Sequence, residues 1–316
     1  MPKRNMNDWI GVKAVWLLSF LLRFLPLEIG LFLGRRVGSL LGRFHSRRRI
    51  AYVNLKAAFG NRLSGRERRK MVIRHFRHLA QNGVEVLCFP RFNQAFLARY
   101  IGGHKERYQT LVNQGRGTIA ITPHFGNWEL TQIVSALLGK PLYVLAREQK
   151  HSRLDDLLNR LRTSHGATAV QKGGGVRELI RELKKGGAAG VLGDLSGGRS
   201  GTVIRFFGRK TTAPSGIFEI ARRTHSIMLP CFLIRQKGPH HQFVVVEPLS
   251  LASTGDAERD LRESVQNYYQ LLEGWIQRYP EQWFWAYKRW KYCFTKRILI
   301  LRDERAGHSN QSEAIR

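Results

Sequence analysis

Cysteine is scarce in this chain: its 316 residues include three, Cys88, Cys231 and Cys293. They lie far apart, so no pair has the short spacing typical of zinc or iron–sulfur ligands. Three cysteines do not make a disulfide framework, which agrees with a reducing compartment. We interpret all three as buried apolar residues rather than reactive thiols, and we predict no metal site.

Acidic residues are also few. The chain has 23 Asp and Glu against 53 Lys and Arg, which gives a formal net charge of +30 at pH 7. Such an excess attracts a polyanion: a nucleic acid, an anionic membrane surface or an acidic protein. Charge alone does not choose among these partners. Because hydrophobic residues make up 43% of the chain, it can bury a full core, and most of it is not disordered.

No signal-peptide cleavage site follows the first apolar run, where the helical pattern continues instead. The run extends from Ala14 to Gly34 and reads AVWLLSFLLRFLPLEIGLFLG. Arg23 near its middle costs a membrane span about 2.5–3.5 kcal/mol, and Pro26 interrupts the helix, while each Leu or Phe contributes about 0.3–0.6 kcal/mol in return. A single span and a shallow in-plane helix both stay open. By either route, we predict that residues 1–45 anchor the protein to a membrane.

Small residues recur every four positions beside this run, at Gly30, Gly34, Gly38 and Gly42. This spacing places them on one face of a helix and favours close packing against another helix. Six arginines stand between and after them: Arg35, Arg36, Arg43, Arg47, Arg48 and Arg49. A basic cluster beside an apolar helix predicts contact with anionic lipid head groups, although an ordinary solvated face has the same composition.

Strand signals are absent from the first 105 residues, so residues 46–105 are predicted to form a helical annex, with Ser64 capping one of its helices. His75 and His78 share a face of that helix, and we interpret them as surface or hydrogen-bonded residues rather than zinc ligands. From 106 to 300 apolar strands alternate with helical segments. This alternation predicts an α/β domain with a mostly parallel central sheet flanked by helices. A polar tail over residues 301–316 is predicted to be disordered.

The predicted elements of the α/β domain follow one another closely. Strands are expected at 118–122, 141–147, 168–170, 188–192, 227–235 and 242–247, and helices at 127–138, 152–164, 176–185, 215–223 and 257–279.

The segment Thr-Pro-His-Phe-Gly-Asn-Trp-Glu, residues 122–129, lies where a buried strand ends and a helix begins. Catalytic groups gather at such carboxyl ends of strands. We expect His124, in the loop, to turn toward Glu129, in the first helical turns, giving a general base and an orienting carboxylate. Gly126 permits close backbone approach, and the helix N-terminus suits a developing oxyanion. The alternative is a structural histidine beside an ordinary helix-start glutamate.

The sequence resembles the bacterial lipid A biosynthesis acyltransferases, the late lauroyl and myristoyl transferases, and the related phosphatidylinositol-mannoside acyltransferases. The resemblance runs from about residue 14 to 292. Its carriers, in chain order, are RRRIAYVNLKAAFG (47–60), HFGNWE (124–129), GDLSGGRSGTVIRFFG (193–208) with Pro214, and YPEQWFWAYKRWK (279–291). The sequence departs from the family at Leu195, where a polar residue is frequent, and at Tyr287, where His is frequent, which leaves the acceptor open.

The resemblance implies a glycerolipid-acyltransferase-like fold and a His-x4-Asp/Glu site in which His124 is the base and Glu129 its partner. It also implies a substrate-binding role for Arg162 and a strand-end aspartate at Asp194. The remaining substrate-binding candidates are Gly126, Asn127 and Arg289.

The implied reaction moves an acyl group from acyl carrier protein, or coenzyme A, to a lipid hydroxyl at the cytoplasmic face of the bacterial inner membrane, with no cofactor. A phosphatidylinositol-mannoside or other phospholipid acceptor stays open. So does a non-catalytic membrane scaffold. A nucleic-acid-binding protein is the main alternative from another class. Trp283, Trp285 and Trp290 lie in the same segment as Lys288, Arg289 and Lys291, a mix that could stack on single strands or sit at a membrane interface.

Overall fold

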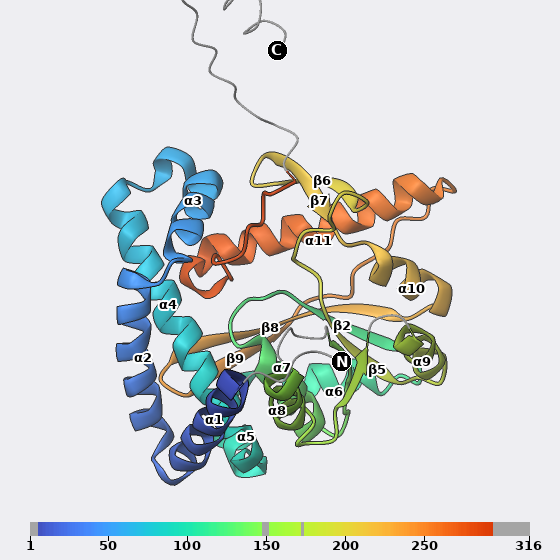
Figure 1. The fold of residues 1–316 in the computed structure, drawn as a ribbon. Coiled ribbons are helices and arrows are strands. Elements are labelled where there is room, and N and C mark those ends of the chain that lie inside the picture. The colour runs from blue at the N-terminus through green and yellow to red at the C-terminus, as the bar shows by residue number, and fades with distance from the viewer. Residues whose placement is uncertain (1–5, 147–151, 172–173, 293–316) are drawn as a thin grey trace, which may run out of the picture.

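The computed structural model describes residues 6–146, 152–171 and 174–292, and Figure 1 traces the chain. The predicted tail at 301–316 and Cys293 lie outside these residues. In the N-terminal part the helices are α1 (Met6–Phe24), α2 (Leu27–Phe44), α3 (Arg48–Phe59), α4 (Gly65–Cys88), α5 (Gln94–Tyr100) and α6 (Lys105–Val112), with short 3-10 turns η1 (Gly60–Arg62) and η2 (Phe89–Arg91).

The C-terminal part alternates strands and helices, as predicted. Its strands are β2 (Thr118–Thr122), β3 (Tyr143–Ala146), β4 (Thr168–Gln171), β5 (Ala188–Leu192), β6 (Thr202–Phe206), β7 (Arg209–Ala213), β8 (Ile227–Lys237) and β9 (His240–Val245). Its helices are α7 (Trp128–Leu137), α8 (Ser152–Arg162), α9 (Gly174–Lys184), α10 (Gly216–Thr224) and α11 (Ala257–Arg278), followed by the turn η3 (Pro280–Gln282).

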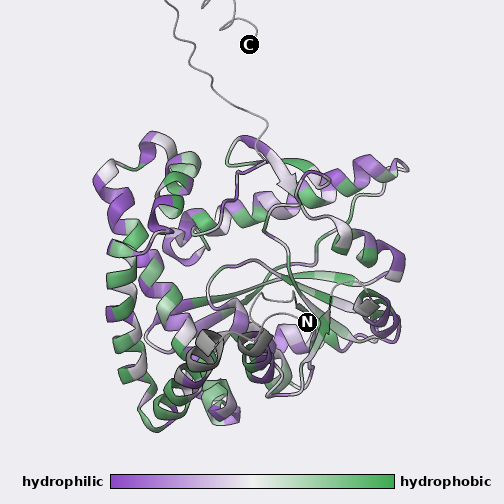
Figure 2. Cartoon of the chain, in the orientation of Figure 1, coloured by the Kyte–Doolittle hydropathy of each residue, from purple (hydrophilic) through white to green (hydrophobic). Residues whose placement is uncertain are grey.

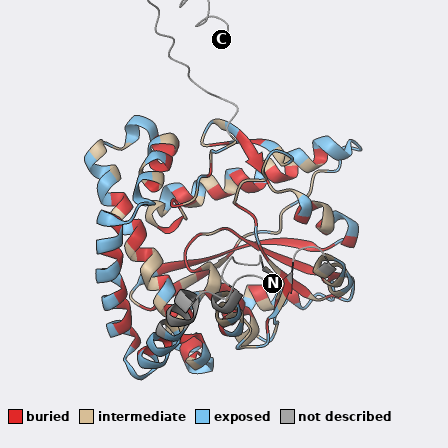
Figure 3. Cartoon of the chain, in the orientation of Figure 1, coloured by how far each residue is buried: buried red, intermediate tan, exposed pale blue. Residues whose placement is uncertain are grey.

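Seven strands form the central sheet in the order β1-β9-β8-β2-β5-β3-β4, where β1 is Ile101–Gly103. Every neighbouring pair is parallel except β8 and β9, which confirms the predicted α/β class. Side chains of β2 alternate between two cores: Ile119 and Ile121 pack in the core that includes α10 and α11, and Ala120 packs in the core that includes α5, α6 and α7. Helices therefore cover both faces, and the strands between them are buried (Figure 3).

Two strand regions depart from the prediction. The first 105 residues are not helical throughout, because Ile101–Gly103 pairs with β9 at the edge of the sheet. This strand has three residues and two glycines, too short for an alternating pattern. The hairpin of β6 and β7 was also not predicted. Its two-residue turn has positive φ at Phe207 (49°) and Gly208 (71°), a type I′ geometry that Asn-Gly normally signals.

The N-terminal helices pack as the small residues predict. The face of α2 that carries Gly30, Gly34, Gly38 and Gly42 lies against α4, and a Cβ added at Gly38 would overlap the backbone of Phe76 and Arg77. Helix α4 begins with a capping box: Ser64 Oγ accepts from Glu67 N (3.2 Å), and Glu67 Oε2 accepts from Ser64 N (2.7 Å). The cap predicted at Ser64 is confirmed.

The outer faces of α1 and α2 leave large apolar side chains in solvent. On α2 they fall at helical spacing, and Figure 2 shows apolar residues along this helix. The exposed set on the two helices and their junction is Trp16, Leu17, Leu18, Phe20, Leu21, Phe24, Leu25, Ile29, Phe32, Leu33, Val37, Leu40, Leu41 and Phe44; we call it the apolar face. In the described ranges, no helix combines the length and hydropathy needed to cross a membrane.

Candidate active site

His124 lies two residues beyond β2, and Asp194 lies two residues beyond β5. These strands are parallel neighbours, and their register pairs Thr122 with Leu192. Because His124 and Asp194 each follow a paired residue by two positions, their side chains meet at the carboxyl edge of the sheet. His124 Nδ1 is 2.6 Å from Asp194 Oδ1. Strand register, not local spacing, therefore builds this pair.

The Asp194 carboxylate is fully buried and held from two sides. Its Oδ1 faces His124, and its Oδ2 accepts a hydrogen bond from Trp283 Nε1 (2.8 Å). Burial acts to raise the pKa of Asp194, but the nearby imidazole and the hydrogen bonds outweigh it, so the pKa lies below its ordinary value. An ionised carboxylate only accepts, so Nδ1 of His124 is the donor of this hydrogen bond.

Aromatic rings enclose the imidazole. The ring of Trp128 lies 5.2 Å from that of His124 and the ring of Phe284 5.8 Å from it, centroid to centroid. Phe284 also donates its backbone N–H to the carbonyl of His124 (2.9 Å). The His124 side chain keeps 14% of its surface exposed while Asp194 keeps none. The imidazole of His124 is thus partly accessible and lies in apolar surroundings.

Glu129 is not the carboxylate that orients His124. It is the second residue of α7, and its carboxylate is held by Arg162, the last residue of α8, through Nε (2.8 Å) and Nη2 (2.5 Å). Gln132 adds a longer contact of 3.4 Å. Burial lowers the pKa of Arg162, but Glu129 outweighs this and raises it. The structure brings Glu129 and Arg162 together as an ion pair and gives the predicted orienting position to Asp194.

Gly126 and Asn127 hold the loop that carries His124. Gly126 has φ +59°, and a Cβ there would overlap the carbonyl oxygen of Leu233 on β8. Asn127 caps α7, its Oδ1 accepting from Leu130 N (3.3 Å), while its Nδ2 donates to Glu85 (2.5 Å). The Asn127 side chain is fully buried. Its side chain thus has internal partners at both ends, and contact with substrate stays a prediction.

Arg289 is also internal. Its side chain is fully buried, donates to Thr211 Oγ1 (3.1 Å) and the Thr212 carbonyl (3.0 Å), and lies over the rings of Phe206 and Tyr269. Its Nε and Nη2 atoms are buried without a hydrogen-bond partner, and contact with substrate stays a prediction for this residue. Trp283 and Trp285 are buried as well, which removes most of the predicted aromatic surface for nucleic acid or membrane.

The histidines of α4 are buried rather than at the surface. His78 Nε2 lies 3.0 Å from the Gly126 carbonyl oxygen, while His75 makes a longer contact of 3.4 Å with the Glu281 carbonyl. Three further polar residues near the His124 loop escape sequence analysis: Asn82, Glu85 and Arg235. For Glu85 the sequence does hold a signal, because it is the charged residue of the apolar stretch GVEVL (83–87). A charge among apolar residues indicates a buried side chain that needs a partner.

Cys88 and Cys231 are free and buried, as predicted, and burial raises the pKa of both thiols. In residues 6–146, 152–171 and 174–292, His, Cys, Asp and Glu side chains form no group of three that could hold a metal ion.

Comparison with known proteins identifies the family of this chain. The sequence model of the family described as "Bacterial lipid A biosynthesis acyltransferase" matches residues 1–292. The protein is an acyltransferase, and the chain belongs to this family.

Three relatives show how far the likeness extends. The chain is 25% identical over 292 residues to the lipid A biosynthesis palmitoleoyltransferase of Escherichia coli K12, covering 91% of this chain and 92% of the relative. It is 26% identical over 298 residues to the lauroyltransferase of the same organism, with the same coverage. A phosphatidylinositol mannoside acyltransferase of Mycobacterium tuberculosis is 25% identical over 153 residues, 46% of this chain and 48% of the relative.

Proposed function

We propose that this acyltransferase moves a fatty acyl group from a thioester to a hydroxyl of a lipid A precursor or related glycolipid, with His124 as general base. The observation that supports this most directly is the His124–Asp194 pair, whose geometry leaves Nε2 free to accept a proton. Membership in the lipid A acyltransferase family supplies the substrate class.

The proposed reaction needs no enzyme nucleophile. His124 Nε2 takes the proton of the acceptor hydroxyl as its oxygen attacks the thioester carbonyl carbon. The imidazolium that forms is stabilised by the Asp194 carboxylate, which Trp283 holds in place. Helix α7 begins four residues after His124, and the positive end of its dipole suits the oxyanion. Collapse of the tetrahedral intermediate releases the thiolate, which takes the proton from the imidazolium.

The central test is His124→Ala, assayed by transfer of a labelled acyl chain from acyl carrier protein to a lipid A precursor. We expect the rate to fall by at least ~10²-fold, the usual scale of general base catalysis. His240→Ala, at an exposed histidine on β9, serves as the matched control and should retain activity. Wild-type turnover in folded His124→Ala protein would falsify the assignment.

The donor and acceptor are separate parts of the proposal. We favour acyl carrier protein over coenzyme A because an acidic carrier suits a net charge of +30. Parallel assays with acyl–acyl carrier protein and acyl-coenzyme A test this. A phosphatidylinositol-mannoside acceptor is the second candidate, supported by the similarity over 153 residues. Acylation of that glycolipid, with a lipid A precursor left unmodified, would favour it.

Membrane attachment through the apolar face is the last part of the proposal. Exposed patches of this kind mark contact sites, and Arg35, Arg36 and Arg43 on α2 add attraction to anionic lipid. We propose that α1 and α2 lie in the plane of the cytoplasmic face of the bacterial inner membrane. Phe32→Glu combined with Leu40→Glu should release the protein from vesicles containing anionic lipid. Val203→Glu, at an exposed apolar residue of β6, is the control; equal sedimentation of both variants would contradict the placement.

A further inference from the structure

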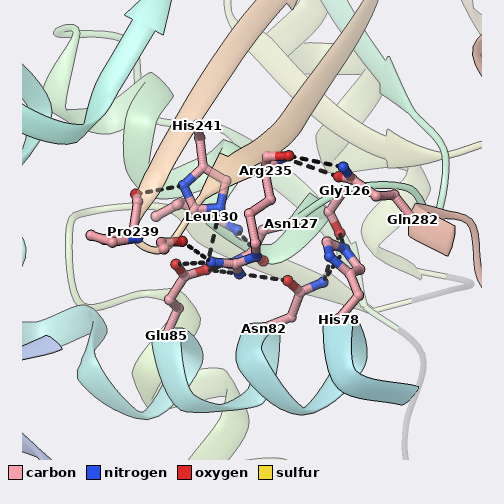
Figure 4. Close-up of polar contacts among 11 residues, drawn as sticks. His78, Asn82, Glu85, Gly126, Asn127, Leu130, Arg235, Pro239, His241 and Gln282 are labelled. Carbon is pink, nitrogen blue, oxygen red and sulfur yellow. Dashed lines mark hydrogen bonds and ion pairs between the residues drawn. The ribbon is translucent and has the colours of Figure 1, made fainter. Parts of the chain in front are cut away.

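A buried polar cluster lies against the His124 loop and takes no part in the proposed proton transfer. Figure 4 shows its members converging from α4, β8, β9, η3 and the loop itself. We call it the loop-anchoring cluster. None of its residues is more than 7% exposed, and they are His78, Asn82, Glu85, Asn127, Arg235, His241 and Gln282. So many polar groups taken out of water need internal partners.

The centre of the cluster is an ion pair between Arg235 and Glu85. Arg235 Nη1 donates to Glu85 Oε1 (2.7 Å), and Nη2 donates to Glu85 Oε2 (2.6 Å) and to Asn82 Oδ1 (2.8 Å). Burial acts to raise the pKa of Glu85, but Arg235 and His241 outweigh it and lower it to about 2. A buried pair of this kind adds little stability over apolar packing, so its effect lies in the groups that its geometry holds in place.

The cluster bonds to both residues that follow Phe125 in the loop. Asn82 Nδ2 donates to the Gly126 carbonyl (2.6 Å), and Asn127 Nδ2 donates to Glu85 Oε2 (2.5 Å). Burial and Arg235 lower the pKa of His78 to about 3, so its ring is neutral and its Nε2–H donates to the same Gly126 oxygen (3.0 Å). The carbonyl of Gly126 thus has two donors from successive turns of α4.

Backbone bonds complete the attachment. Gly126 N donates to the Gln282 carbonyl (3.0 Å), and Asn127 N donates to the Leu233 carbonyl (2.9 Å). The Gln282 side chain pairs with the backbone of Arg235 in both directions, at 3.0 and 2.9 Å. One arginine therefore ties α4, β8 and η3 to the segment that begins two residues after His124.

We propose that Asn82, Glu85 and Arg235 are positioning residues for the proposed reaction: they fix the loop so that the His124 ring stays against Asp194. They touch neither substrate nor reacting atoms and act through Gly126 and Asn127. The proposal rests on His124 being the general base. Displacing a catalytic group by about 1 Å can cost ~10²-fold in rate, so the anchoring contacts affect turnover more than substrate binding.

The test is Asn82→Asp, which keeps an acceptor for Arg235 but removes the donor to the Gly126 carbonyl. We expect kcat to fall at least ~10-fold while KM changes by less than about twofold. Tyr108→Phe is the matched control, because it removes a buried hydroxyl bonded to Ser135 (2.6 Å) away from the loop. It should lower stability and leave kcat unchanged.

Coupling to Asp194 separates positioning from general destabilisation. If Asn82 acts through the His124–Asp194 geometry, Asn82→Asp should cost less in an Asp194→Asn background than in wild type, whereas independent effects multiply. Effects on kcat that multiply would overturn the proposal, as would wild-type kcat in folded Asn82→Asp protein. If that variant does not fold, His78→Phe removes the second donor to Gly126 and is subject to the same criteria.

Hydrogen exchange supplies a readout that needs no substrate. The amides of Gly126 and Asn127 should exchange faster in Asn82→Asp than in wild type, and at the wild-type rate in Tyr108→Phe. Unchanged exchange of these amides would overturn the anchoring role. Activity retained by His124→Ala would instead contradict the proposed general base, and the exchange result would still report on the loop.

Discussion

Replacing Asp194 by Asn tests the proposed base most sharply, because the structure dictates which way the new amide must turn. Trp283 Nε1 is a donor only and points at the Asp194 Oδ2 position (2.8 Å). In the variant we expect the single amide oxygen to face Trp283, which leaves the NH2 group facing His124 Nδ1. A neutral imidazole that accepts at Nδ1 carries its proton on Nε2 and cannot act there as a base.

The size of the effect follows from two losses. The productive tautomer is reached only by breaking the new hydrogen bond, and the imidazolium of the transition state loses its buried counter-ion. Hydrogen bonds to charged groups contribute about 1.5–3 kcal/mol each. With the tautomer cost added, we expect kcat to fall by ~10²–10⁴-fold, which corresponds to about 3–5 kcal/mol. KM should change little, because Asp194 is fully buried and does not contact substrate in the proposed reaction.

The assay is acyl transfer measured at saturating donor and acceptor, with circular dichroism confirming the fold. Trp283→Phe supplies the internal control, since without the indole N–H the introduced amide can turn its oxygen toward His124. Asp194→Asn should therefore cost less in the Trp283→Phe background than in wild type. Wild-type kcat in Asp194→Asn protein refutes the role of the carboxylate. An equal penalty in both backgrounds refutes the tautomer argument.

Three predictions concern stability, measured by chemical denaturation. Gly38→Ala should destabilise by about 1–3 kcal/mol because its Cβ overlaps the α4 backbone, whereas Gly83→Ala, which faces open space on α4, should be neutral or stabilising. Ser64→Ala should cost about 1 kcal/mol by removing the α4 cap, and an unchanged midpoint would contradict that role. Burial lowers the pKa of His75 to about 4, below its unfolded value of about 6.5. The free energy of unfolding should therefore decrease as pH falls through this window, and His75 accounts for about 2 kcal/mol of the decrease at pH 5. In His75→Phe the free energy of unfolding should depend less steeply on pH.

Local sequence determined much of the fold. Strands β2 and β5 have the predicted ends because each is a short apolar run bounded by Gly or Pro, at Gly117 and Pro123 for β2 and at Gly187 and Gly193 for β5. The same property located His124 and Asp194 at strand ends, and the four-residue glycine spacing identified the packing face of α2. Hydrophobic periodicity and turn residues act over a few positions, so they are visible without a partner segment.

Tertiary structure alone decided which carboxylate meets the histidine. Glu129 is five residues from His124 and Asp194 is seventy, yet parallel pairing of Thr122 with Leu192 brings the distant residue to Nδ1 and leaves Glu129 to Arg162. The burial of Arg289 and the Glu85–Arg235 ion pair were hidden for the same reason. Charge and polarity are properties of single residues, but burial and pairing depend on which segments the folded chain places side by side.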